Sequence, residues 1–236
     1  MSSEHPAALL EAVVADDPAR PVVTFYDDAT GERTELSGAT LSNWVAKTAN
    51  LLIDGAGLGP GDPVAVLLPA HWQTAAVLLG CWAAGVAVAR TDPTPVDVAF
   101  VARDRLEEAT AWSPGETYGL ALAPLAAPMR DAPAGVADYV IEVRTFGDRF
   151  APATPVDPDG PALDGLSFRE VVERARQRAR EIGLEARGRL LAVDPVDPVD
   201  WLVAPLAVGG SVVLSVNTDR AKLSDRAASE RVTVTL

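Results

Sequence analysis

The sequence predicts an α/β fold with mainly parallel sheets flanked by helices. From residue 63 onward, short apolar strand-like runs alternate with helix-like stretches, and this alternation is typical of a parallel sheet covered by helices. A glycine-rich turn at residues 55–61 separates an amphipathic helix from the apolar strand expected at 64–68. Residues 211–216 are rich in valine, as in a buried strand.

The first 55 residues predict a helix, a hairpin and a second helix. Leu9 and Val13 belong to an apolar pattern of helical spacing that stops at residues 16–18, and 22–26 is an expected strand followed by a turn at 28–31. Ser37 is an expected N-cap of the next helix. That helix carries one apolar stripe, formed by Leu41, Trp44, Val45, Thr48, Leu51 and Leu52.

Residues 63–145 predict alternating strands and helices, and the first lobe is expected to span 1–145. The expected strands are 64–68, 86–89, 98–102, 118–122 and 139–143, with a helix at 71–84 and a short helix near Leu106. Residues 146–166 carry four prolines among glycines and aspartates, so we expect no regular element in this connection.

The second, partial lobe is expected to span 167–236. Ser167 and Glu170 form a capping box that begins a helix running to about residue 182. A strand at 190–193 leads to Asp197, an expected N-cap followed by Pro198 at the first helical position. Strands at 211–216 and 231–236 complete the predicted elements.

Composition excludes several classes of function. The net charge of −13 would repel a phosphate backbone, so no nucleic-acid partner is expected. The apolar segment at 74–89 is shorter than the roughly 20 residues that span a bilayer, and the N-terminus has no signal-peptide pattern, so we expect a cytoplasmic protein without a membrane partner. Cys81 is the only cysteine, which excludes a disulfide framework.

Four fragments, in order, resemble the adenylate-forming (acyl-CoA synthetase, AMP-dependent ligase) superfamily. The segment 57–69 is similar to its "Gly-x-x-x-Gly-Asp-x-Val-Ala" motif, and the others are 37–41, 80–86 and 204–214. The resemblance implies the N-terminal subdomains of an acyl-CoA synthetase without the C-terminal domain, a layout shared with short actinobacterial relatives. The glycines at 55–61 follow a helix instead of opening one, which argues against a dinucleotide loop.

In this family, a Ser/Thr/Gly-rich loop ending in lysine binds the ATP phosphates just before the helix that here begins near Ser167. Residues 154–165 instead carry Asp157, Asp159, Asp164 and several prolines, and neither lysine of the chain is nearby. Carboxylates repel a triphosphate, and proline lacks the amide donor that such a loop needs. The resemblance therefore predicts a non-catalytic homologue with no catalytic residues, no cofactor and no cofactor-binding residues.

Asp194, Asp197 and Trp201 are the candidates for lining a ligand pocket. They stand between a predicted strand and the following helix, where α/β proteins usually bind ligands, and the equivalent turn of the family borders the acyl pocket. The aspartates at 194–200 do not follow EF-hand spacing and helix capping explains two of them, so no metal site is predicted. Cys81 and His71 are ten helical residues apart, too far for a catalytic dyad.

Three functions remain open. The first is a binding module for a small acyl or aryl ligand or for a protein partner, in which a homodimer covers an exposed sheet edge. The alternative is an ATP-dependent acid:CoA or adenylate-forming ligase whose nucleotide site is atypical or is completed by a partner chain. The third is a wholly different enzyme on the same scaffold, because fold does not dictate function.

Overall fold

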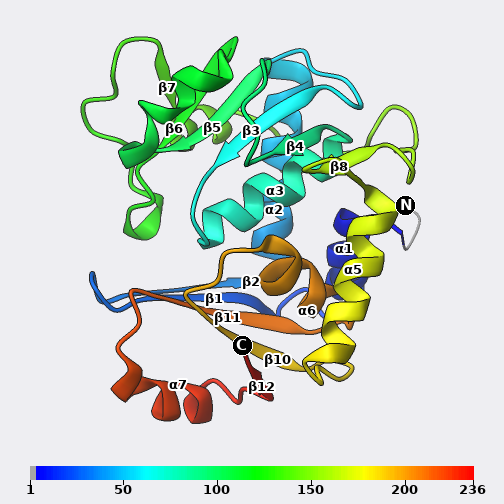
Figure 1. Cartoon of the computed structure of the whole chain (residues 1–236), viewed down its shortest axis with the longest axis vertical. Helices are drawn as coiled ribbons and strands as arrows, with labels where there is room; N and C mark the ends of the chain where they lie inside the picture. Colours follow the sequence, from blue (N-terminus) through cyan, green and yellow to red (C-terminus); the bar gives the residue numbers. More distant parts are fainter. Residues whose placement is uncertain (1–3) are drawn as a thin grey trace. The chain divides into compact units, whose positions relative to one another are not determined.

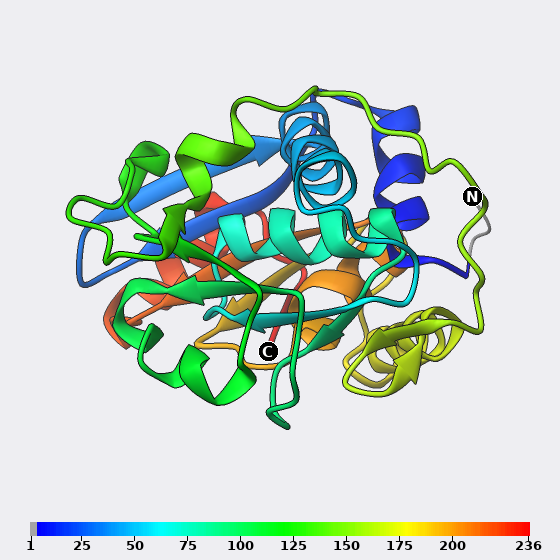
Figure 2. The same cartoon turned by 90° about the horizontal axis from the view of Figure 1, so that it is seen from above.

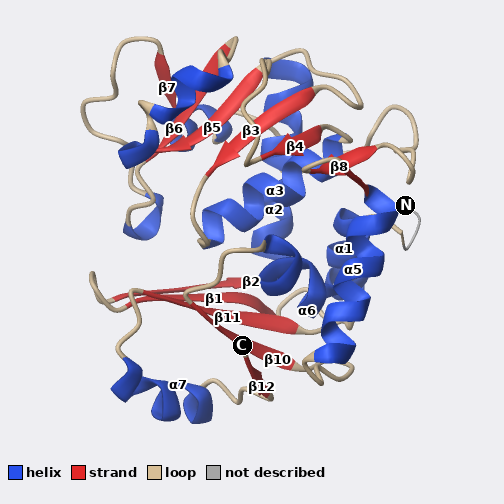
Figure 3. Ribbon diagram, viewed as in Figure 1, coloured by secondary structure: helices blue, strands red, loops and turns tan. Residues whose placement is uncertain are grey.

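The computed structural model describes residues 4–236 and forms two compact units. Unit 1 comprises residues 43–69 and 73–168, and unit 2 comprises 4–42, 70–72 and 169–236. Each unit contains one mostly parallel sheet with helices beside it, which confirms the predicted α/β class (Figures 1 and 3). These contact-based units alternate along the chain, so the consecutive lobes 1–145 and 167–236 stay a prediction.

Unit 1 contains a seven-stranded sheet in the order β7-β6-β5-β3-β4-β8-β9. Neighbouring strands are parallel except for the antiparallel pair β8 and β9. The strands are β3 (Pro63–Leu67), β4 (Ala87–Ala89), β5 (Val98–Ala102), β6 (Glu116–Leu120), β7 (Val136–Asp138), β8 (Pro161–Leu163) and β9 (Leu166–Ser167).

Helix α3 (Trp72–Ala84) lies beside this sheet (Figure 2). Trp82 is fully buried, and its indole Nε1 donates a hydrogen bond to the Ala162 carbonyl of β8 at 3.0 Å. Gly80 allows α3 to approach helix α2 (Gly38–Asn50) closely, because a Cβ atom at residue 80 would lie 2.5 Å from the Cβ of Thr48. A glycine is therefore required at this contact.

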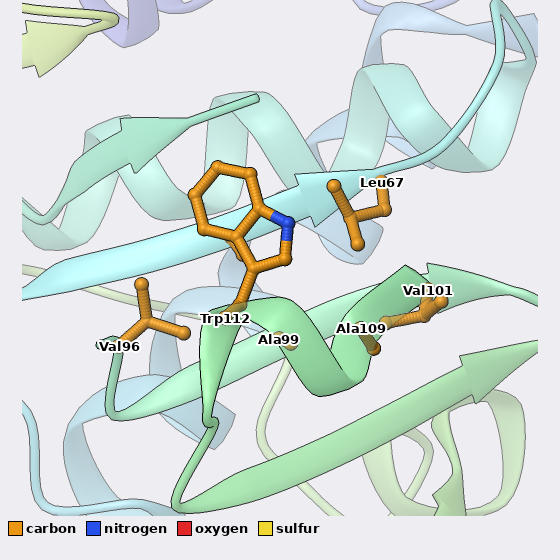
Figure 4. Packing of buried hydrophobic residues seen from close by; sticks show 7 residues of the cluster. Leu67, Val96, Ala99, Val101, Ala109 and Trp112 are labelled. Carbon is orange, nitrogen blue, oxygen red and sulfur yellow. The ribbon is translucent and has the colours of Figure 1, made fainter. Parts of the chain in front are cut away.

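A second layer of unit 1 packs around Trp112 (Figure 4). The indole is 1% exposed and lies in a buried cluster with Leu67 of β3 and Val101 of β5. Two short 3₁₀ helices, Arg103–Arg105 and Glu108–Trp112, bring it there. The short helix expected near Leu106 is thus present as two 3₁₀ segments on either side of that residue.

Unit 2 contains a five-stranded sheet in the order β12-β10-β11-β1-β2. Strands β1 (Pro21–Asp27) and β2 (Glu32–Ser37) form the predicted hairpin, and Gly31 has the positive φ of 76° that the turn requires. The other strands are parallel: β10 (Arg189–Val193), β11 (Ser211–Val216) and β12 (Val234–Thr235).

The helices of unit 2 begin where the sequence indicates, apart from the last. Helix α1 is Pro6–Asp16, and α5 (Phe168–Glu181) ends before Gly183, which has a φ of 70°. The helix after Asp197 contains the π-helical segment η5 (Val199–Val203) and continues as α6 (Ala204–Ala207). Helix α7 (Leu223–Ser229), preceded by the 3₁₀ segment Arg220–Lys222, was not predicted.

Helix α2 and its C-terminal extension confirm the predicted apolar stripe. Ser37 accepts a hydrogen bond from the Thr40 amide at 3.2 Å, so it caps the helix as expected. Leu41, Leu51 and Leu52 are at most 1% exposed, and the last two lie in the π-helical segment η1 (Leu51–Gly55). The following glycine turn is closed by Asp62, whose carboxylate accepts from the Gly59 amide at 2.7 Å. This geometry agrees with the prediction that the glycines at 55–61 form a turn and not a dinucleotide-binding loop.

Two expectations were wrong, and a third was right in kind but shifted in its bounds. Residues 139–143 form helix α4 (Tyr139–Val143) instead of a strand, because the Asp138 carboxylate accepts from the Ile141 amide at 2.9 Å and caps a helix at that point. The connection 146–166 was expected to hold no regular element, yet β8 lies within it and forms a hairpin with β9. The strand expected at 118–122 ends at Leu120, and Leu122 has a positive φ of 50°.

Within residues 4–236, none of the helices combines the length and the apolar character needed to cross a bilayer.

Candidate functional site

The segment 154–165, where the resemblance puts the phosphate loop, ends in a tight hairpin of unit 1. Strands β8 and β9 pair Leu163 with Leu166, and only Asp164 and Gly165 connect them. Both connecting residues have positive φ values, 46° and 84°, as a two-residue hairpin turn of type I′ requires. A turn of two residues has too few amides to surround a triphosphate.

Asp164 fixes this turn to the end of β4. Its carboxylate accepts from the Arg90 amide at 2.8 Å and forms an ion pair with the Arg90 guanidinium at 3.0 Å. The Asp164 amide donates to the Val88 carbonyl at 2.8 Å. The Arg90 guanidinium and the Asp164 amide therefore both already have partners within unit 1.

The amides of two residues before β8 also donate to acceptors within the chain. The Asp159 amide donates to the side chain of Asp157 at 3.0 Å, and the Gly160 amide donates to the Asp157 carbonyl at 3.0 Å. Asp157 and Asp159 are exposed residues, and both add negative charge to this stretch of chain. An approaching phosphate meets negative charge and amides that already have acceptors.

The three predicted pocket residues have different environments in unit 2. Asp194 and Asp197 are exposed in the loop after β10, whereas Trp201 is 1% exposed in η5. Asp197 accepts from the Val199 amide at 2.9 Å, which confirms its role as a helix cap. Trp201 contributes to the core, and a pocket formed by these three residues stays a prediction.

Asp200, in the first turn of the same helix, is paired with Arg178 at 3.1 Å. Burial raises the pKa of Asp200, and the charge of Arg178 partly offsets this rise. Capping and pairing thus account for two of the aspartates at 194–200. Among residues 4–236, no group of three or more His, Cys, Asp or Glu side chains has the arrangement of a metal site.

His71 and Cys81 have environments that suppress their chemistry. Burial lowers the pKa of His71 to about 3, and its ring packs edge-on against Phe25 with centroids 4.3 Å apart. Burial also raises the pKa of the Cys81 thiol, which is fully buried. At neutral pH, a buried neutral imidazole and a buried thiol are core groups.

An ionic cluster that sequence analysis missed lies on one face of the five-stranded sheet. We call it the Glu230 network: the Glu230 carboxylate accepts from Tyr26 at 2.5 Å, from Arg189 at 2.7 Å and from Arg33 at 2.9 Å. Tyr26 and Glu230 are 204 residues apart in sequence, so no local pattern links them. Burial alone would raise the pKa of Glu230, but these hydrogen bonds outweigh it and lower the pKa to about 2.

A second buried ion pair flanks the Glu230 network. Arg226 of α7 donates to Asp28 at 2.7 Å, and its guanidinium lies 4.2 Å from the centre of the Tyr26 ring. Burial and the hydrogen bond to Glu230 raise the pKa of Tyr26, so the phenol stays protonated at neutral pH. Because every charged group is paired, these contacts stabilise the fold and offer no free acid or base.

Unit 2 also contains a groove beside α1 and α6. Its volume is about 330 Å³, and its lining residues include Leu9, Val13, Asp16, Arg20, Arg187 and Leu206. Sequence analysis did not predict this groove, because its walls come from α1, from residues 186–187 and from 206–209, which lie far apart in the chain.

Comparison with known proteins agrees with this fold. The family of AMP-binding enzymes matches residues 10–105. A TIGR03089 family protein of Mycobacterium tuberculosis H37Rv is 45% identical over 235 residues, which cover 96% of this chain and 95% of the relative. A sulfoacetate–CoA ligase of Cupriavidus necator H16 is 32% identical over 231 residues, which cover 88% of this chain and 44% of the ligase.

Two solved structures share the fold. The acyl-CoA synthetase of Brucella canis superimposes with a TM-score of 0.77 at 18% identity, over 98% of this chain and 46% of the synthetase. The fatty acyl CoA synthetase of M. tuberculosis has a TM-score of 0.65 at 17% identity, over 97% and 48% of the respective chains. The chain thus spans about half the length of these synthetases and of the ligase. The match to AMP-binding enzymes relates this chain to adenylate-forming enzymes of the acyl-CoA synthetase type. The near full-length match to the M. tuberculosis relative shows that the chain belongs to the TIGR03089 family.

Proposed function

We propose that this protein is a non-catalytic relative of the acyl-CoA synthetases that does not bind ATP. The observation that carries the proposal is the two-residue turn Asp164–Gly165 at the place where the resemblance puts the phosphate loop. A loop that surrounds phosphates needs several amides and hydroxyls directed at one point. The hairpin offers instead a carboxylate that is already paired with Arg90.

Charge supports the same proposal. Asp157 and Asp159 precede the hairpin and are exposed, so an incoming triphosphate is repelled at the position where a lysine would attract it. The amides of Asp159 and Gly160 donate to Asp157, and breaking these bonds would add to the cost of binding a phosphate. Loop length, charge and hydrogen bonding all oppose ATP.

In place of catalysis we propose binding, either of a small acyl or aryl ligand or of a protein partner. The fold of an acyl-CoA synthetase supplies the scaffold, and a sheet edge supplies a surface for a second copy. In unit 2 the edge strands are β2 and β12. Light scattering on the purified chain is expected to show a dimer, and a strict monomer across the micromolar range would refute the homodimer.

The decisive test of non-catalysis is ATP–pyrophosphate exchange with a panel of aliphatic, aromatic and sulfonated carboxylic acids. The sulfoacetate–CoA ligase of C. necator serves as a positive control in the same assay. We expect exchange at background level and no heat of binding when Mg²⁺-ATP is titrated into the chain by calorimetry. Acid-dependent exchange would refute the proposal and establish the alternative, a ligase with an atypical nucleotide site.

A further inference from the structure

The groove of unit 2 has the size and lining of a small-molecule site. We call it the α1–α6 groove, and its volume of about 330 Å³ is at the lower end of the range for ligand pockets. Leu9 and Val13 of α1 and Leu206 of α6 contribute its apolar lining. These three side chains are 2–7% exposed, so they are fixed by packing in the core.

Two arginines give the α1–α6 groove an excess of positive charge. Arg187 forms an ion pair with Asp16 at 2.5 Å, so one of the two cations of the groove is neutralised. Arg20 donates to the Gly209 carbonyl through Nη2 at 2.7 Å, an uncharged acceptor, so its charge has no counterion among the lining residues. A net positive groove is notable in a chain with a net charge of −13.

Arg20 also has an unused donor. Its Nε is buried and has no hydrogen-bond acceptor in the part of the chain that the structure describes. Buried donors without acceptors are uncommon, and such a group is a reason to look for a missing partner. An anion beside Arg20 would supply the counterion that the guanidinium lacks.

From these contacts we propose that the α1–α6 groove binds a small carboxylate that carries a short apolar chain. The carboxylate lies against Arg20 and Arg187, and the chain lies along Leu9, Val13 and Leu206. The proposal rests on the ligand-binding part of the proposed function, and it deepens that part by naming the ligand class and a place distinct from Asp194, Asp197 and Trp201. It requires neither ATP nor a chemical step.

The probe is octanoate, titrated into the full-length ¹⁵N-labelled chain and followed by NMR. We expect a dissociation constant of about 1 mM, with the largest shifts at residues 186–187 and 206–209. Octan-1-ol and octylammonium have the same chain without a negative charge. We expect octylammonium to cause no shifts in the groove, because the groove already contains two guanidinium groups.

Matched variants separate the charged part of the site from the apolar part. Arg187→Asn removes a lining cation and is expected to weaken octanoate binding about fivefold. The control is Arg231→Asn, which alters an exposed arginine outside the groove with a similar positive φ, and it is expected to leave octanoate binding unchanged. Ala12→Leu fills the groove from an exposed helical position and abolishes binding, whereas Ala15→Leu on the same helix does not. Asp16→Asn frees Arg187 from its ion pair and tightens binding.

Three results would overturn the proposal. These are the absence of octanoate shifts up to about 20 mM, equal binding of octanoate and octan-1-ol, and equal affinity of the Arg187→Asn and Arg231→Asn variants. The ATP-exchange result is measured separately. Octanoate binding with active exchange would refute only the non-catalytic function, and no binding with no exchange would refute only the groove.

Discussion

Replacing Glu230 by glutamine is the sharpest test of how unit 2 holds its C-terminal segment. The Glu230 side chain is only 9% exposed and accepts hydrogen bonds from Tyr26, Arg189 and Arg33. Glutamine keeps the shape but removes the charge, so it leaves the largely buried Arg189 guanidinium and the half-exposed Arg33 guanidinium without a shared carboxylate. We expect the Glu230→Gln variant to be less stable at neutral pH, because unpaired buried charge is costly.

The magnitude follows from the lowered pKa. The pKa of Glu230 falls from 4.5 to about 2, and each unit corresponds to about 1.4 kcal/mol of preference for the ionised form in the folded state. After allowance for solvent screening of the partly exposed Arg33, we expect a loss of about 2 kcal/mol. Because the pKa is lower in the folded state, this stabilisation is present above about pH 4.5 and is lost as the pH falls toward 2.

The assay is urea unfolding of the wild type, of Glu230→Gln and of the control Glu185→Gln, which alters an exposed glutamate of unit 2. The difference between wild type and Glu230→Gln is expected to shrink as the pH falls from neutral to about 3, whereas the control remains within about 0.5 kcal/mol throughout. A Glu230→Gln protein as stable as the wild type at pH 7 would refute the reasoning. So would a stability difference that does not depend on pH.

Three further predictions test packing and dynamics. Gly80→Ala places a methyl group 2.5 Å from the Thr48 Cβ and is expected to destabilise unit 1 by about 1–3 kcal/mol in urea unfolding; a change below about 0.5 kcal/mol would contradict the tight contact. His71, with a pKa lowered to about 3, is expected to show constant imidazole NMR shifts between pH 5 and 8, and a titration there would show that the ring is not buried in solution. Arg226→Met removes the pair with Asp28 and is expected to speed hydrogen exchange in α7 more than in β1; equal protection would show that α7 does not depend on this pair.

The elements that the sequence predicted well are those in which local pattern and burial coincide. The apolar stripe of α2 is buried, and the turn at 28–31 gives the expected hairpin, because glycine and helix spacing act over a few residues. The strands at 64–68 and 211–216 agree for the same reason. In each case neighbouring residues carry enough information.

The errors occur where distant residues decide the local structure. Residues 139–143 read as a strand, but the Asp138 carboxylate accepts from the amides of Met129 and Ile141 and directs the chain into a helix. Helix α7 shows no apolar stripe, since its only buried residue is Arg226, paired with Asp28 at the other end of the chain. Sequence spacing does not record such partners.

The sequence by itself determined the fold class, the family resemblance and the acidic, proline-rich character of 154–165. Tertiary structure alone decided that this segment ends in a two-residue turn paired with Arg90, and that Arg20 and Arg187 line one groove. The physical reason is the distance along the chain over which each interaction acts. Helix periodicity, capping and turn chemistry act between near neighbours, whereas an ion pair or a groove depends on which side chains the folded chain brings within a few ångströms of each other.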